Sequence, residues 1–105
     1  CYTITVIISL EDAGFCGKGE GGKFVEKTDL TYKGEFPVNT HGGELSAGQP
    51  GSAGFMIGIT EAVRQLTGRA EKRQVPDARY AFLNSNGGTL SVEASLVLGS
   101  EAPRG

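Results

Sequence analysis

The stretch from Ser52 to Thr67 carries the clearest hydrophobic pattern in the chain. Its apolar residues recur every three or four positions, which is the period of one face of an α-helix. The apolar positions are Met56, Ile59, Val63 and Leu66, and the polar positions of the opposite face are Glu61, Arg64 and Gln65. We therefore expect an amphipathic helix whose apolar face turns toward the core. Gly68 is expected to end this helix.

Two segments near the C-terminus have the composition of β-strands. Residues 79–84 and 91–98 are rich in aromatic, branched and other apolar side chains. The Asn-Gly-Gly sequence between them, within residues 85–89, is typical of a tight turn. The pattern predicts an antiparallel hairpin.

The N-terminal third is ambiguous from its pattern alone. The β-branched run from Thr3 to Ile8 favours a strand. The spacing of its isoleucines, with Gly14 as the residue after a helix end, favours a helix over residues 3–13 instead. Residues 17–36 are polar and rich in glycine, so we expect a surface excursion with one helical turn at Lys23–Lys27.

Composition and charge exclude several classes of function. The net charge of −2 and the isoelectric point near 5.3 provide no broad field that would attract nucleic acid or an anionic membrane. No apolar run reaches the ~18 residues of a transmembrane helix, and residues 1–10 lack the features of a signal peptide. Four basic residues lie close together, and we expect them to form a solvated helix end: Arg64, Arg69, Lys72 and Arg73.

Cysteine and histidine are scarce. Cys1 and Cys16 do not resemble a disulfide framework, which indicates a reducing, cytoplasmic setting. Because His41 is the only histidine and the two cysteines are far apart, we expect no metal site. The chain has no initiator methionine and starts at once with an apolar segment, so we expect a fragment or excised domain of a larger protein.

Residues 39–54 form a glycine-rich loop that runs directly into the predicted helix. Four of its glycines are expected to take positive φ angles and to let a ligand approach the backbone closely: Gly42, Gly43, Gly48 and Gly51. The N-terminus of the following helix would offer unpaired N–H groups to an anion or a polarised oxygen. For His41 we expect a hydrogen bond within the loop. The glycines match neither a dinucleotide-binding nor a P-loop pattern.

Two longer motifs carry a family resemblance. Residues 39–50 read Asn-x-x-Gly-Gly-x-x-Ser-x-Gly-x-Pro, and residues 14–22 read Gly-Phe-Cys-Gly-Lys-Gly-Glu-Gly-Gly. With them, the chain resembles the C-terminal part of a thiolase, and the most similar subgroup is that of the sterol-carrier-protein and lipid-transfer-protein thiolases. The resemblance runs from Cys1 to about Gly99, roughly the last quarter of a full thiolase.

The resemblance implies an α/β fold. We expect a thiolase-like C-terminal half-domain, with a mixed sheet, helices and the C-terminal antiparallel hairpin, as a single partial domain over residues 1–105. It also favours the helix ending at Gly14 over the strand. The half of a thiolase that holds the nucleophilic cysteine would lie outside this chain, so the fragment alone should be inactive.

The resemblance also assigns roles within the glycine-rich loop. Thiolases carry a histidine at the position of Gln49, and that histidine donates a hydrogen bond to the thioester oxygen. The amide of Gln49 is able to donate the same bond, but it cannot carry a proton as an imidazolium does. The loop is also one residue shorter after Pro50 than the family pattern. The four loop glycines would form the thioester cradle.

Two further positions are implied by the resemblance. Asn84 stands where thiolases often have a cysteine that acts as the catalytic base, which asparagine cannot do. We expect a substrate-binding role for Asn84, with a plain hairpin turn as the alternative. Cys1-Tyr2-Thr3 is similar to the Cys-Phe-Thr of the subgroup's His-Asp-Cys-Phe motif. Cys1 is therefore a candidate catalytic acid or base, and a buried structural thiol is the alternative.

The sequence thus predicts the C-terminal part of a lipid-transfer-protein-type thiolase that acts on acyl-CoA thioesters by acyl transfer or carbon–carbon cleavage. The alternative is a non-catalytic acyl-CoA-binding, lipid-binding or scaffold subunit on a degenerate thiolase fold. The resemblance implies no cofactor beyond the coenzyme A thioester that is the substrate. It also implies a homo-oligomer and, as a partner, a small protein with an OB-fold and a zinc ribbon.

Overall fold

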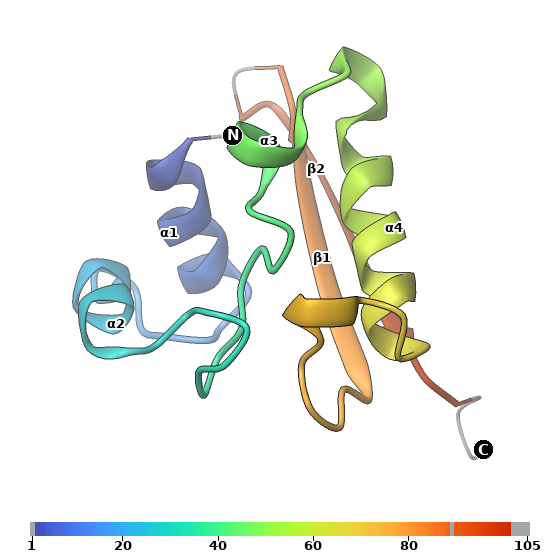
Figure 1. The fold of residues 1–105 in the computed structure, drawn as a ribbon. Coiled ribbons are helices and arrows are strands. Elements are labelled where there is room, and N and C mark those ends of the chain that lie inside the picture. The colour runs from blue at the N-terminus through green and yellow to red at the C-terminus, as the bar shows by residue number, and fades with distance from the viewer. Residues whose placement is uncertain (1, 89, 102–105) are drawn as a thin grey trace. The chain divides into compact units, whose positions relative to one another are not determined.

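The computed structural model describes residues 2–88 and 90–101, without the side chain of Ser52, as two compact units (Figure 1). The first unit comprises residues 1–40 and the second comprises residues 41–105. The expectation of a single domain over the whole chain stays a prediction. Among the helices of the described residues, none is both long and apolar enough to cross a membrane.

The first unit begins with helix α1, Thr3–Asp12, so the helix is confirmed over the strand. Gly14, with φ of 84°, lets the chain turn back at the helix end. The N–H of Phe15 donates to the carbonyl of Leu10 at 3.0 Å, which closes the end of the helix. Burial of Leu10 and this C-terminal cap outweigh the β-propensity of the isoleucines.

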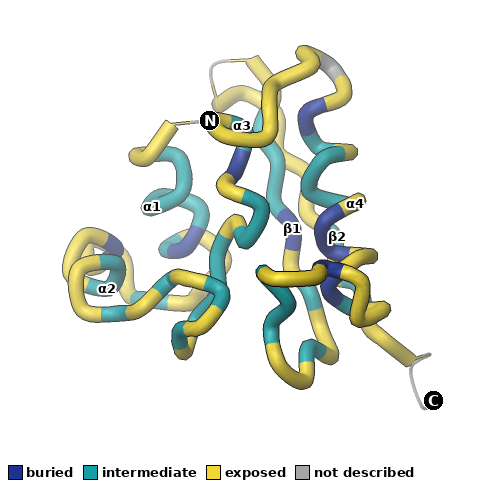
Figure 2. Tube along the Cα trace, in the orientation of Figure 1, coloured by how far each residue is buried: buried dark blue, intermediate teal, exposed yellow. Residues whose placement is uncertain are grey.

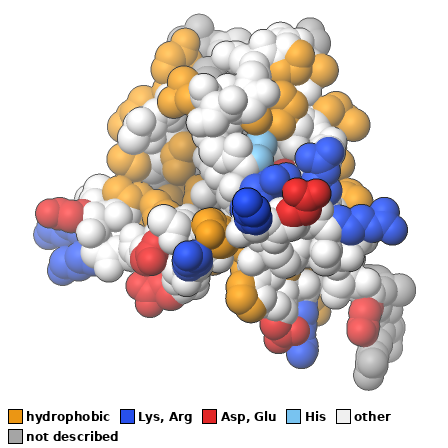
Figure 3. Space-filling view, in the orientation of Figure 1, with side chains coloured by type: hydrophobic (Ala, Val, Ile, Leu, Met, Phe, Trp, Pro, Cys, Tyr) orange, Lys and Arg blue, Asp and Glu red, His pale blue; other side chains and the backbone are white. Residues whose placement is uncertain are grey.

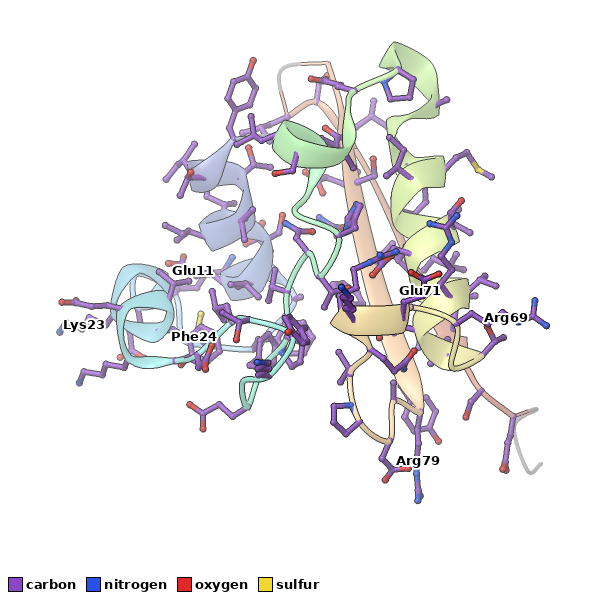
Figure 4. All side chains as sticks on the ribbon, in the orientation of Figure 1. Glu11, Lys23, Phe24, Arg69, Glu71 and Arg79 are labelled. Atoms are coloured by element: carbon purple, nitrogen blue, oxygen red, sulfur yellow. The ribbon has the colours of Figure 1, made fainter. Side chains whose placement is uncertain are left out.

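Helix α2, Gly21–Lys27, is tied to α1 through Glu11. The Glu11 Oε1 accepts the N–H of Gly21 at 2.9 Å. Backbone N–H groups of Gly19 and Gly21 lower the pKa of the Glu11 carboxyl below its usual range. Figure 4 shows Glu11 between the two helices. The predicted helical turn at Lys23–Lys27 is confirmed, and the helix starts two residues earlier.

Three aromatic rings pack together in the first unit. Phe36 meets Phe15 and Phe24 edge-on, with ring centroids 5.1 Å and 5.3 Å apart. The segment after α2 is irregular, and the N–H of Val38 donates to the carbonyl of Leu30 at 2.9 Å. The surface segment predicted for residues 17–36 therefore contributes two aromatic rings to a small apolar cluster that it shares with Phe15.

The second unit places one long helix beside a hairpin (Figure 1). Its elements are α3 (Glu44–Ala47), a 3₁₀ turn (Gly51–Ala53), α4 (Gly54–Leu66), a second 3₁₀ turn (Glu71–Arg73), β1 (Tyr80–Gly87) and β2 (Val92–Gly99). The fold is α/β and ends in an antiparallel hairpin, as the sequence predicts. Within the described residues the sheet consists of these two strands.

The hairpin turn lies later than predicted. Strand pairing runs from Tyr80 opposite Gly99 to Gly87 opposite Val92, so residues 85–87 belong to the ladder and not to the turn. The chain reverses at Gly88 and Leu90, whose φ angles are 61° and 56°. The prediction was wrong here because Asn86 and Gly87 have the residue types of a turn, but their backbone is still paired with β2.

Helix α4 also turns a different face inward than predicted. Met56 and Val63 are 56% and 48% exposed, whereas Glu61 and Gln65 are 6% and 7% exposed. Small residues bring the helix close to β1, since a Cβ on Gly58 would lie 3.3 Å from Leu83 Cδ2. Figure 2 marks buried residues on α4 and β1 where the two elements lie side by side.

The two buried polar side chains of α4 are compensated by the connector that follows the helix. The Arg73 guanidinium binds the Glu61 carboxylate through Nε at 2.9 Å and Nη2 at 2.8 Å. The Gln65 Nε2 donates to Glu61 Oε1 at 3.0 Å and to the Arg73 carbonyl at 2.8 Å. Hydrogen bonding to Glu61 raises the pKa of Arg73 further above neutral pH. Glu61 is therefore buried with its charge paired.

Gln65 is fixed in one orientation by a backbone donor. The N–H of Val75 donates to Gln65 Oε1 at 2.8 Å, so the NH₂ group must be the end that faces Glu61. Gln74 adds a second link, because its Nε2 donates to the Gln65 carbonyl at 2.9 Å and its Oε1 accepts the N–H of Ala70 at 3.1 Å. These bonds hold the connector of residues 70–75 against α4.

The network predicts a specific response to Gln65→Glu. The new carboxylate would place a hydrogen-bond acceptor, in place of a donor, beside the Glu61 carboxylate and the Arg73 carbonyl. Gln65→Ala only removes hydrogen bonds, and it should lower the free energy of unfolding by about 1–3 kcal/mol. We expect Gln65→Glu to destabilise the protein more than Gln65→Ala at pH 7. Repulsion raises the folded-state pKa of the carboxyl pair, so the excess loss should shrink as the pH falls toward 4. Urea unfolding of the intact protein at several pH values measures this, and a pH-independent difference would contradict it.

Candidate functional site

The glycine-rich loop has the backbone that its residues predict. The φ angles of Gly42, Gly43, Gly48 and Gly51 are 91°, 69°, 107° and 64°, so all four lie in the region that favours glycine. The single turn of α3 is therefore bracketed by left-handed residues on both sides. The loop folds back on itself before α4 begins.

Gln49 lies at the exposed part of this loop, between Gly48 and Pro50. Gly48, with φ of 107° and ψ of 158°, ends α3 directly before it. Within the described part of the chain, no hydrogen bond engages the Gln49 side chain. Its carboxamide is therefore available to a ligand, as the expected thioester contact requires.

Glu44, the first residue of α3, reaches across the loop to α4. A Cβ placed on Gly54, the first residue of α4, would collide with the Glu44 carboxylate. The sequence predicts an open helix N-terminus at this point, and the structure instead places a carboxylate of the same chain there. Carboxylates are favoured at helix N-termini because of the unpaired N–H groups and the helix dipole.

His41 does not make the expected hydrogen bond within the loop. Its Nδ1 is buried and has no hydrogen-bond partner among the described residues. The residue as a whole is only half-buried. Among the described residues of the loop, none forms a hydrogen bond with Nδ1. The expected hydrogen bond is therefore wrong for this atom.

Asn84 lies within β1, paired with Ser95 on β2. Its Oδ1 accepts the Ser95 hydroxyl at 2.7 Å, and its Nδ2 donates to Glu93 Oε2 at 2.8 Å. Both ends of the amide are thus occupied by the neighbouring strand. The alternative of a simple turn residue is excluded by this position in the ladder.

The two cysteines differ in what the structure says of them. Cys1 lies outside the described residues, so its assignment as acid or base stays a prediction. Burial, followed by the charges of Glu11 and Glu20, raises the pKa of the Cys16 thiol above its ordinary value. A protonated thiol fits a structural role for Cys16. No group of three metal-ligating side chains occurs over the residues described.

The basic residues near the end of α4 divide into two groups. Arg64, Arg69 and Lys72 are exposed, and Figure 4 shows Arg69 pointing away from the helix. Arg73 instead binds the buried Glu61. Figure 3 shows basic and acidic side chains interspersed on this face. The expected solvated helix end holds for three of the four residues and is wrong for Arg73.

Comparison with known proteins identifies the relationship. Residues 1–100 match the model of the family described as thiolase C-terminal domain-like. The chain belongs to this thiolase C-terminal domain-like family. The match covers almost all of the chain, so it confirms both the predicted resemblance and the α/β fold class.

Three relatives show the breadth of the thiolase-like group. Sterol carrier protein 2 of Bos taurus is 39% identical over 87 residues, which are 83% of this chain and 16% of that protein. Acetyl-CoA acetyltransferase of Methanothermobacter thermautotrophicus is 40% identical over 89 residues, 85% of this chain and 23% of that protein. The 17-hydroxy-3-oxo-4-pregnene-20-carboxyl-CoA lyase of Mycobacterium tuberculosis is 39% identical over 98 residues, 93% of this chain and 24% of that protein.

The chain therefore spans a quarter or less of the length of these thiolase-like relatives. The structure brings the four loop glycines, Gln49 and Asn84 into one unit. Their roles in binding and catalysis stay predictions, and Cys1 is not described. Glu44 is the residue that the sequence analysis missed in this loop.

Asn84 has two interpretations that a substitution separates. Asn84→Ala removes the bonds to Ser95 and Glu93, so a role in the strand pair predicts a lower melting temperature with kcat and KM changed less than about threefold. A role in substrate binding predicts a KM raised about fivefold or more, because a lost neutral hydrogen bond is worth ~1 kcal/mol or more. Steady-state kinetics of the intact protein, with Ser95→Ala as the control that breaks the same pair, distinguish the two.

Proposed function

We propose that this chain forms the thioester-binding loop of a lipid-transfer-protein-type thiolase relative that breaks a carbon–carbon bond in an acyl-CoA substrate. The membership of the thiolase C-terminal domain-like family supports acyl-CoA as the ligand class. The observation that carries the proposal is the exposed Gln49 amide, which has no partner among the described residues and follows a left-handed glycine.

The nature of the side chains favours cleavage of a β-hydroxyacyl-CoA over thiolysis. Thiolysis needs side chains that move protons, and the resemblance places a histidine and a cysteine at the positions of Gln49 and Asn84. Both positions hold amides here, and an amide donates hydrogen bonds without transferring a proton. An oxygen that develops negative charge needs only donors, so Gln49 is sufficient for a reaction that passes through an enolate.

The proposed reaction is a retro-aldol cleavage. A base, for which Cys1 is the candidate, removes the proton of the β-hydroxyl. The bond between Cα and Cβ breaks, and its electron pair moves through Cα onto the thioester oxygen, where the Gln49 amide stabilises it. The β-carbon leaves as a ketone or aldehyde, and protonation at Cα gives the shortened acyl-CoA. The name of the mycobacterial relative, a carboxyl-CoA lyase, fits this class of reaction.

The second candidate function is acyl-CoA or lipid binding without catalysis. The occupied amide of Asn84 favours it, because that side chain is committed to Ser95 and Glu93. Under either function we expect a cytoplasmic homo-oligomer that pairs with a small protein carrying an OB-fold and a zinc ribbon. Gly42, Gly43, Gly48 and Gly51 would line the thioester in both cases.

Dependence on free coenzyme A separates the reactions. We expect the intact protein to cleave a β-hydroxyacyl-CoA into a carbonyl compound and a shorter acyl-CoA without added coenzyme A, because no thiol enters the products. Chromatography of the acyl-CoA products, with the β-ketoacyl-CoA of equal length as the matched substrate, measures this. A strict need for free coenzyme A would show thiolysis instead. Binding of both substrates by calorimetry without turnover would support the second candidate.

Gln49 is tested by two variants of the intact protein. Gln49→Ala should lower kcat ~10²–10³-fold, the usual loss when one oxyanion donor is removed. Gln49→Glu has the same length but no N–H donor, and its charge repels an enolate, so it should be at least as impaired. KM should change far less than kcat, because the bond strengthens as charge develops on the oxygen. Equal turnover in all three proteins would remove Gln49 from the mechanism.

A further inference from the structure

At Gly54 the Glu44 side chain, and not the backbone conformation, occupies the place that a larger residue would need. Its φ and ψ angles of −54° and −41° are helical, so any residue is able to adopt them. It is nevertheless buried, and the side chain of Glu44 fills the place of its Cβ. The carbon of the Glu44 carboxylate, Cδ, would lie 3.4 Å from a Cβ at this position. Position 54 is therefore constrained by a side chain ten residues earlier.

The place that Glu44 reaches is favourable for a carboxylate. Helix α4 begins at Gly54 after Ala53, which provides no side-chain cap. The N–H of Gly54 itself donates to the carbonyl of Gly51, so what favours a carboxylate here is the positive end of the helix dipole. The Glu44 carboxylate lies against the first turn of α4, and it therefore provides the negative charge that the helix start otherwise lacks.

The first unit contains the same arrangement with its hydrogen bond resolved. A Cβ on Gly21, the first residue of α2, would lie 2.6 Å from Ile7 Cγ2 and 2.7 Å from Glu11 Oε1. There the carboxylate accepts the Gly21 N–H at 2.9 Å. In both units a glutamate on one helix lies over a glycine that opens the next helix. Gly54 differs in that its own N–H donates to the Gly51 carbonyl, so the two units share only the packing of a glutamate side chain over a glycine that opens a helix.

We propose that Glu44 is a positioning residue for Gln49. The contact joins the start of α3 to the start of α4, and Gln49 lies in the segment that these two points enclose. The Gln49 side chain has no hydrogen bond to the described residues, so the backbone of its segment is what limits the region that its amide reaches. Fixing both ends of the segment therefore narrows the region in which the donor lies. The inference rests on the role proposed for Gln49 above.

Two single substitutions remove the contact by independent routes. Glu44→Ala deletes the carboxylate, and Gly54→Ala displaces it. We expect either change in the intact protein to lower kcat about tenfold, the scale of a small misplacement of a catalytic group, with KM within about threefold. The double variant should be no slower than either single variant, because an alanine side chain at position 54 fits once the carboxylate is absent. Losses that multiply would overturn the proposal.

Two controls test whether the effect passes through Gln49. In a Gln49→Ala background, Glu44→Ala should cause no further loss of kcat, and an undiminished loss there would overturn the proposal. Glu44→Gln keeps the length and the acceptor oxygen, so it should retain most of the activity lost in Glu44→Ala. A Glu44→Gln protein as slow as Glu44→Ala would exclude positioning by this contact.

A double-mutant cycle followed by melting temperature tests the contact between Glu44 and Gly54 without an activity measurement. Gly54→Ala should lower the melting temperature of the otherwise unchanged protein. In the Glu44→Ala background it should leave the temperature equal or higher, because alanine is the better helix former. Equal shifts in both backgrounds would overturn the contact itself. If Gln49→Ala alone leaves turnover unchanged, the proposed function fails, whatever this cycle shows.

Discussion

The second unit depends on the buried charge pair between Glu61 and Arg73. The pair costs desolvation, and its partners offset that cost because the guanidinium fork and the Gln65 amide together satisfy the carboxylate. Gln65 then holds the backbone at Arg73 and Val75. The connector that leads into β1 is thereby fixed to α4 and sets where the hairpin starts. The loop before α4 and the sheet after it share this one helix as their support.

The loop with Gln49 uses a related device at the other end of the same helix. Glu61 is buried because a cation meets it, whereas Glu44 lies against the helix start because a glycine leaves room for it. Both carboxylates join α4 to a neighbouring segment. The helix that the hydrophobic pattern predicts is therefore joined to its neighbours through polar side chains as well as through its packing on β1. That pattern assigns these polar side chains to the solvent.

The sequence is informative where local chemistry decides the structure. Gly14 and Gly68 end their helices as predicted, because few other residues take positive φ at such an end. Periodicity locates α4 but fails for its buried face, since the partner of Glu61 lies twelve residues away in an irregular connector. Glu44 is missed for a related reason. Gly54 looks like one more glycine of the loop, and only the structure shows that the Glu44 side chain occupies the place of its Cβ.

The glycine loop illustrates the difference between ancestry and chemistry. Its backbone angles follow from glycine itself, so they would persist whatever stands at position 49. The reaction depends instead on which groups move protons, and the two loop and strand positions that the family resemblance assigns to that task hold amides, Gln49 and Asn84. Under the proposed function, these two amides stabilise charge on a thioester oxygen but do not transfer protons. Under the proposed function, proton transfer must therefore come from Cys1 or from parts of the protein beyond this chain.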